Sequence, residues 1–138
     1  MSALYTGVFR ANQVLASIEK IRPNVTDEPQ ITKLAQIEAQ AYSLRGLFYF
    51  YLNNSFNNGN VPYINEIAEV EEDYYKKVTP SDEIKKYYRE DLQKALDLGL
   101  NDKWEKTDLG RITSWAVKAI LGKSYLYDKE YNKAAELF

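Results

Sequence analysis

The chain has 138 residues, a net charge of −2 and a hydrophobic fraction of 45%, which suits one globular domain or part of one. It contains no cysteine and no histidine, which excludes cysteine nucleophiles, histidine bases and ordinary zinc sites. No basic run points to nucleic acid, and no apolar run is long enough for a transmembrane helix. The unusual feature is aromatic, with 12 Tyr, 5 Phe and 2 Trp.

Residues 2–21 are predicted to form the first helix, with Ser2 as a plausible N-cap. The helix should end at Arg22, because the following Pro23 disfavours a helical conformation in the residue before it. Residues 24–29 are then a loop. Apolar residues repeat every three or four positions on one face of this helix: Leu4, Val8, Ala11, Leu15 and Ile18.

Residues 30–56 are predicted to form a long helix that the others pack against. At 1.5 Å per residue it would be roughly 40 Å long. Two rows at helical spacing make it apolar or aromatic on almost every side near its end, so we expect neighbours on more than one side. The first row is Leu34, Ile37, Ala41, Leu44, Phe48 and Tyr51, and the second is Ala35, Glu38, Tyr42, Arg45, Tyr49, Leu52 and Phe56.

The next stretch is predicted to be mostly irregular. Residues 57–60 read Asn-Asn-Gly-Asn, which ends a helix because Asn and Gly tolerate left-handed backbone. Residues 61–62 are then extended. Residues 65–78 form a long surface connection with at most a short helical turn, and connections of that length often carry function.

A third helix is predicted to begin at Thr79-Pro80, with Thr79 as the cap and Pro80 in the first turn. Ser81 is the alternative cap. The helix should run to about Leu98 and stop at Gly99, because glycine favours the left-handed conformation that closes a helix.

Residues 100–110 are predicted to be a polar loop, followed by a fourth helix from Arg111 or Thr113 to Tyr127. A fifth helix starts near Tyr131 and should still be running at Phe138. Because a helix that stops without a cap looks truncated, we interpret residues 1–138 as a single partial domain. The apolar face left bare there should cause association or fraying.

The end of the chain carries a repeat-like spacing. Gly122, Tyr125, Tyr131, Ala134 and Phe138 resemble the tetratricopeptide pattern, in which small residues let paired helices approach and aromatic residues fill the gap. The tryptophan usual in that pattern would fall on Lys118.

Motifs in a fixed order over nearly the whole chain resemble the helical core of the SusD/RagB family. An aromatic-Val-Ala-Asn opening is followed by a Glu-Ala…Leu-Arg-Gly…Tyr-Phe helix, a Phe…Gly-x-Val-Pro segment, an Asp-Leu-x-x-Ala helix and a Gly-Arg-Ile-Thr turn. The matching residues are Tyr5, Val8, Ala11 and Asn12; Glu38, Ala39, Leu44, Arg45, Gly46, Tyr49 and Phe50; Phe56, Gly59, Val61 and Pro62; Asp91, Leu92 and Ala95; and Gly110 to Thr113.

This resemblance implies an all-α fold of stacked antiparallel helix pairs of tetratricopeptide type, an α-α superhelix. It implies a lipoprotein of the outer membrane and cell surface in Bacteroidetes-type bacteria, held by a lipid anchor absent from this chain. Such proteins bind oligosaccharides or other nutrients, serve a SusC-like TonB-dependent transporter, and are not enzymes. Family chains are several times longer, with an N-terminal lipoprotein segment and a C-terminal remainder that this chain lacks.

Arg45 is a charged residue within the largely apolar long helix predicted over residues 30–56. A buried charge needs a partner, so we expect a structural ion pair with Asp91 or Glu38 rather than a ligand contact.

Four aromatic residues outside the helical stripes are the candidates for ligand binding, because sugars stack on Trp and Tyr rings. They are Tyr63, Tyr74, Tyr75 and Trp104. The competing interpretation is packing of loops onto helices. The aromatic residues at helical spacing should instead be core: Tyr42, Tyr49, Tyr51, Trp115, Tyr125 and Tyr131.

The acidic run at residues 69–73 is interpreted as a solvated loop, because catalytic carboxylates need a rigid separation across a cleft. We expect no catalytic residue, metal or cofactor. The function expected is nutrient binding beside a transporter, with this part mainly scaffold and docking surface. A tetratricopeptide-like protein interaction module is the alternative, and an enzyme of the α/α-barrel type ranks third.

Overall fold

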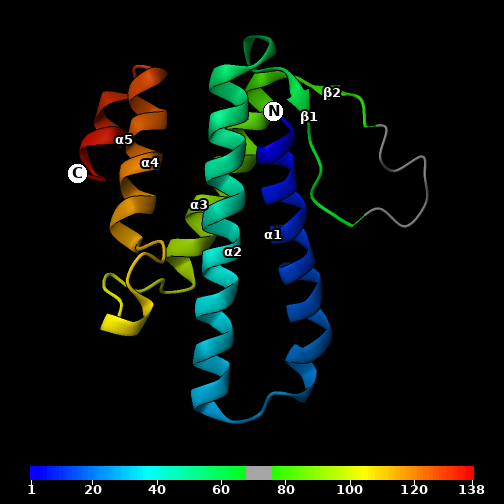
Figure 1. Cartoon of the computed structure of the whole chain (residues 1–138). Helices are drawn as coiled ribbons and strands as arrows, with labels where there is room; N and C mark the ends of the chain where they lie inside the picture. Colours follow the sequence, from blue (N-terminus) through cyan, green and yellow to red (C-terminus); the bar gives the residue numbers. More distant parts are fainter. Residues whose placement is uncertain (68–75) are drawn as a thin grey trace.

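The structure, a computed structural model, describes residues 1–67 and 76–138. Its described part contains five α-helices: α1 (Ser2–Ile21), α2 (Glu28–Ser55), α3 (Ser81–Asp97), α4 (Ser114–Tyr127) and α5 (Tyr131–Ala135) (Figure 1). The described residues also include three short 3₁₀ turns, Arg22–Asn24, Asn57–Gly59 and Lys106–Asp108. The predicted all-α class is confirmed.

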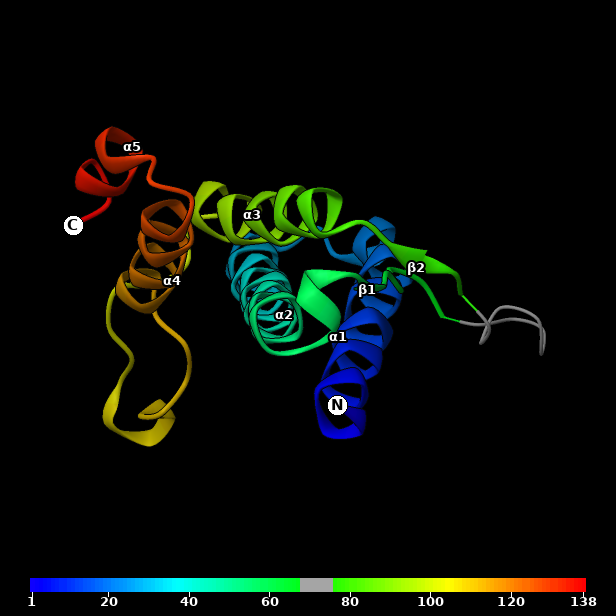
Figure 2. The ribbon, with the colours of Figure 1, turned by 90° about the horizontal axis from the view of Figure 1, so that it is seen from above.

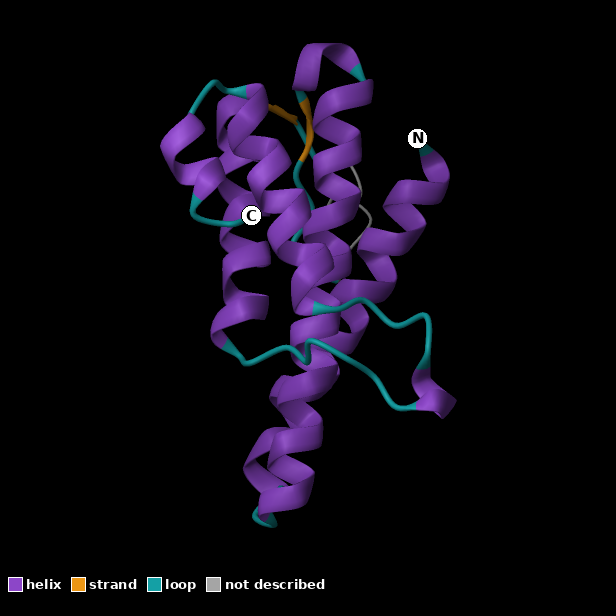
Figure 3. Cartoon of the chain, turned by 90° about the vertical axis from the view of Figure 1, so that its left-hand side faces the viewer, coloured by secondary structure: helices purple, strands orange, loops and turns teal. Residues whose placement is uncertain are grey.

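Each helix packs mainly on its neighbours in the chain, so successive helices stack side by side. Seen from above, α2 lies between α1 and α3, while α4 and α5 continue the stack beyond α3 (Figure 2). The loop from α3 to α4 projects away from the helices (Figure 3). This order is the helix-pair stacking expected of a tetratricopeptide-like unit.

A two-stranded ladder joins the ends of the connection between α2 and α3. β1 (Val61–Pro62) pairs antiparallel with β2 (Val78–Thr79), with Val61 opposite Thr79. The extended conformation predicted for residues 61–62 is confirmed, but the sequence did not reveal their partner strand. A strand of two residues is too short to show the alternating apolar and polar pattern from which strands are predicted.

The face that α2 buries differs from the first predicted row. Tyr49 and Leu52 of the second row are fully buried, whereas Leu44 and Tyr51 remain 39% and 49% exposed. The reason is geometric: α1 and α3 cover the side that carries Tyr49. The prediction that Tyr51 belongs to the core is therefore wrong.

Gly46 sets the closest approach between α2 and α3. A β-carbon built there would lie 2.9 Å from the Leu92 Cγ atom and 3.1 Å from the Tyr88 carbonyl oxygen. Only glycine leaves room for this crossing, so Gly46 is a small contact between the two helices.

Three helix starts differ from the predictions. α1 begins at Ser2 itself, with Met1 at the N-cap position and no side-chain capping bond, so the predicted Ser2 cap is wrong. α2 begins at Glu28 with Pro29 in its first turn, so the predicted loop 24–29 is too long. α3 is capped by Pro80 without a side-chain hydrogen bond, since Thr79 lies in β2 and Ser81 is already helical. Both predicted caps of α3 are therefore wrong, and the Ser81 hydroxyl accepts a hydrogen bond from Asn53 instead.

The C-terminal pair is partly as expected. Thr113 caps α4, its hydroxyl accepting from the Ala116 amide at 3.3 Å. α5 ends at Ala135, so the prediction that it runs on to Phe138 is wrong. Trp115 and Tyr131 are 61% and 62% exposed, which corrects their assignment to the core.

Candidate functional site

A buried ionic cluster joins three helices around Arg45 of α2. Its Nε and Nη2 atoms donate to the two carboxylate oxygens of Asp91 on α3, both at 2.7 Å. Its Nη1 atom donates to the Asn12 amide oxygen of α1 at 2.8 Å. Such two-point pairing of guanidinium and carboxylate fixes the direction as well as the distance of the contact.

Burial and pairing act against each other within this cluster. Burial raises the pKa of the Asp91 carboxyl, while the hydrogen bonds from Arg45 oppose that rise. Burial lowers the pKa of Arg45, but the bonds to Asp91 outweigh it and the net shift is upward. The other proposed partner, Glu38, bonds Arg22 at 2.6 Å instead.

Tyr63 lies in a column of aromatic rings beside β1. Its ring stacks on Tyr87 with centroids 4.2 Å apart and lies 5.1 Å from the Tyr49 ring. Burial raises the pKa of Tyr63 to about 12. Because stacking on Tyr87 covers one ring face, Tyr63 packs the connection onto the helices.

Trp104 lies half-buried in the loop between α3 and α4. Its Nε1 atom donates to the Ile112 carbonyl at 2.8 Å, and the Arg111 guanidinium lies 5.7 Å from the ring centroid. The Trp104 ring therefore stabilises the loop between α3 and α4, to which it belongs.

The structure places the two described aromatic candidates, Tyr63 and Trp104, apart from each other. Tyr63 follows β1 before α3 begins, whereas Trp104 follows the other end of α3. Tyr74 and Tyr75 lie outside the described residues, as does the acidic run 69–73. All four remain predictions as ligand-binding residues.

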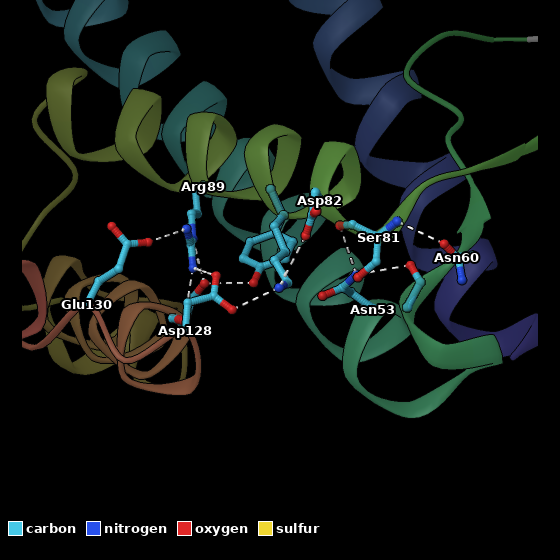
Figure 4. Close-up of polar contacts among 11 residues, drawn as sticks. Asn53, Asn60, Ser81, Asp82, Arg89, Asp128 and Glu130 are labelled. Carbon is cyan, nitrogen blue, oxygen red and sulfur yellow. Dashed lines mark hydrogen bonds and ion pairs between the residues drawn. The ribbon is translucent and has the colours of Figure 1, made fainter.

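A second polar network joins α3 to α4 and α5, and no sequence motif predicted it (Figure 4). Arg89 donates to Asp128 at 2.6 Å and to Glu130 at 3.2 Å, and Lys85 reaches Asp128 at 2.8 Å. Burial would raise the pKa of Asp128, but the hydrogen bonds from Lys85 and Arg89 lower it overall. The α3–α4 contact is therefore ionic as well as apolar.

A smaller network closes the end of α2 (Figure 4). The Asn53 side-chain amide donates to the Gly59 carbonyl at 3.0 Å and to the Ser81 hydroxyl at 2.9 Å. Asn60 accepts from the Ser81 backbone amide at 3.0 Å. These bonds tie the start of α3 to the turn after α2.

The residue 1–126 segment matches a protein-family model described as "Starch-binding associating with outer membrane". The chain belongs to the SusD-like family. A SusD-like protein of Bacteroides ovatus is 29% identical over 131 residues, which is 95% of this chain and 22% of that protein.

Solved structures give the same family and the same fold. A laminarin-binding SusD-like protein is 32% identical with a TM-score of 0.84, over 99% of this chain and 28% of its own. The surface glycan-binding protein A of Bacteroides uniformis is 25% identical with a TM-score of 0.81, over 99% and 29%. This chain thus spans under a third of the length of these SusD-like relatives.

Three residues that carried the SusD-like resemblance bond the backbone of β1 and of the segment that follows it. The Tyr5 hydroxyl donates to the Pro62 carbonyl at 2.8 Å, and the Asn12 amide donates to the Ile64 carbonyl at 3.0 Å. Tyr49 bonds both backbone groups of Ile64, accepting from its N–H at 2.6 Å. The motif therefore anchors backbone rather than presenting groups to solvent.

Two negative findings concern the described residues only. No cluster of three or more acidic, His or Cys side chains among them could hold a metal ion. Within residues 1–67 and 76–138, no helix has the length and apolar character needed to cross a membrane.

Proposed function

We propose that this SusD-like protein takes part in binding oligosaccharides or other nutrients at the outer membrane, with its helices serving mainly as scaffold and docking surface. The observation that carries the proposal is the match of residues 1–126 to a family described as starch-binding. The laminarin-binding relative, with its TM-score of 0.84 at 32% identity, supports a carbohydrate ligand.

The role of a scaffold follows from how the polar groups are used. Hydrogen bonds join Arg45 to Asp91 and Asn12, and Asn12 also bonds a backbone carbonyl. Groups satisfied in this way stabilise a shape and leave little for a ligand. A rigid stack of helices suits the presentation of a binding surface.

A glycan panel tests binding and separates it from catalysis. The chain is run through native gels that contain single soluble polysaccharides, and each polysaccharide is then recovered and sized. We expect retarded migration in at least one gel, with the polysaccharide unshortened. Shortened chains would contradict the binder and favour an enzyme.

We further propose a SusC-like TonB-dependent transporter as the partner and the cell surface as the location of the full-length protein. The test is expression of the tagged gene in its native host, followed by membrane fractionation and purification in mild detergent. A TonB-dependent transporter should co-purify from the outer-membrane fraction. Recovery of the protein from the cytosol alone would oppose the proposal.

A tetratricopeptide-like interaction module remains the second candidate. It is favoured by an apolar groove of about 360 Å³ between α1 and α2, whose lining includes Val14, Ile37, Leu44 and Phe48. Half-exposed apolar side chains in a groove are typical of protein-binding surfaces. Binding of peptides without any binding of glycans would support this alternative.

A further inference from the structure

A polar cleft of about 760 Å³ is lined by residues of α1, α2 and α3. Tyr42 and Arg45 of α2 contribute its floor, Glu19 and Lys20 of α1 one wall, and Lys94 of α3 the other. Residues 65–67 close one end. The volume falls within the range of small-molecule sites, roughly 300–1,000 Å³.

Two of the charged groups around the cleft already have partners. Arg45 is neutralised by Asp91 at 2.7 Å, and the Glu66 carboxylate receives a hydrogen bond from Lys76 at 3.1 Å. The buried Arg45–Asp91 pair gives the floor a fixed shape. The exposed Glu66–Lys76 pair balances its own charges but adds little rigidity.

Four further side chains around the cleft lack such partners among the described residues. Within residues 1–67 and 76–138, the side chains of Glu19, Lys20 and Lys94 make no ion pair, and the Tyr42 hydroxyl makes no hydrogen bond. The Lys94 ammonium lies 5.2 Å from the Tyr42 ring centroid, which brings it over the floor. Among the described lining residues without an ion-pair partner, two ammonium groups stand against one carboxylate, which leaves a single positive charge.

We propose that this cleft binds a sugar unit that carries a carboxylate, such as a uronic acid within an oligosaccharide. The ammonium groups of Lys20 and Lys94 attract the ligand carboxylate, and Glu19 and Tyr42 bond its hydroxyls. The single negative charge of the ligand carboxylate balances the one excess positive charge on the cleft walls. The inference rests on the proposed glycan binding and adds its site and sugar class.

Titration calorimetry with a matched pair of probes tests the inference. The probes are trigalacturonate and neutral galactotriose, and the proteins are the wild type, Lys20→Gln, Lys94→Gln and Lys86→Gln. Lys86 is an exposed lysine on the same helix as Lys94 but does not line the cleft. Circular dichroism checks that all variants fold.

The wild type should bind trigalacturonate more tightly than galactotriose. Lys20→Gln and Lys94→Gln should each weaken trigalacturonate binding about tenfold, the loss of one charge-assisted contact, and Lys86→Gln should not. Equal binding by all four proteins, or binding of neutral glycans alone, would overturn the inference and leave the proposed function standing. Failure to bind any glycan of a wider panel would overturn both.

Discussion

Arg45 and Asp91 bring opposite charges out of water at the point where α2 crosses α3. Their side chains are only 7% and 4% exposed. A buried pair of this kind adds little net stability over apolar residues, but removal of one partner leaves the other charge buried and unpaired. The value of the pair therefore lies in fixing how the helices meet.

Replacement of either partner should reduce stability. Asp91→Ala or Arg45→Met is expected to lower the free energy of unfolding by about 3–5 kcal/mol, because a lone charge stays in the core. Urea denaturation followed by circular dichroism measures the change. Asp97→Ala, at an exposed carboxylate of the same helix, is the control and should cost under about 0.5 kcal/mol.

The same pair offers a second check. A double variant, Arg45→Met with Asp91→Leu, should recover much of the loss because it removes both charges together. A melting curve for Asp91→Ala that overlays the wild type would contradict the role assigned to the pair.

Asp128 should make stability depend on pH in the acidic range. Its pKa is lowered in the folded protein from the ordinary value of 3.8, since Lys85 and Arg89 bond the ionised form. The folded state thus holds this proton more weakly than the unfolded state, so its contribution is present above the unfolded pKa and is lost as pH falls through the folded one.

Asp128→Asn serves as the test of that dependence. The free energy of unfolding of the wild type should exceed that of the variant at about pH 6, and the difference should shrink as pH drops below about 4. Urea titrations at a series of pH values measure both proteins. A difference that stays constant down to about pH 3 would argue against the contribution of Asp128.

Gly46 shows how one residue sets the contact between two elements. Its position lets Leu92 and the Tyr88 carbonyl come within 2.9 and 3.1 Å of where a β-carbon would lie. Alanine has the better helix propensity by about 1 kcal/mol, so propensity and packing oppose each other here. Because the nearby atoms include backbone, packing should prevail.

Gly46→Ala is therefore expected to destabilise the protein by about 1–3 kcal/mol through overpacking. Thermal or urea unfolding measures this, with Lys33→Ala at an exposed position of α2 as the matched control. A gain in stability for Gly46→Ala would show that the helices can separate freely and that the crossing is not tightly packed.

The short helix α5 is the element expected to open most easily. It spans only Tyr131–Ala135 and packs chiefly on α4, with Tyr131 62% exposed. Hydrogen exchange should show its amides unprotected while those around Tyr49 in α2 exchange slowly. Equal protection of α5 and α2 would contradict this account and the predicted fraying.

At the scale of the molecule, periodicity and helix-stop residues predicted the order and type of all the long helices. Sequence reasoning was weaker wherever the outcome depends on a distant partner. Tyr51 and Tyr49 both lie at helical spacing, yet only Tyr49 is covered, because the position of α1 and α3 around α2 decides which row is buried. Local pattern alone does not contain that information.

The polar contacts, too, could be predicted from the sequence only in part. Arg45 signalled itself as a charge in an apolar helix, and the sequence offered two partners of which the structure joins it to Asp91. Arg89 and Asp128 gave no signal, because each is an ordinary charge on a partly exposed face until α3 and α4 meet. Of the aromatic candidates, Tyr63 and Trp104 make packing contacts, which was the competing interpretation, but their spacing did not identify the partners.

Glycan binding is the activity that we propose for this SusD-like protein. Titration calorimetry of the wild-type chain against two ligand libraries tests it most directly, one of soluble oligosaccharides and one of peptides. The account predicts saturable binding of at least one oligosaccharide and none of the peptides. Saturable binding of peptides with no heat from any oligosaccharide would contradict it and favour a protein interaction module.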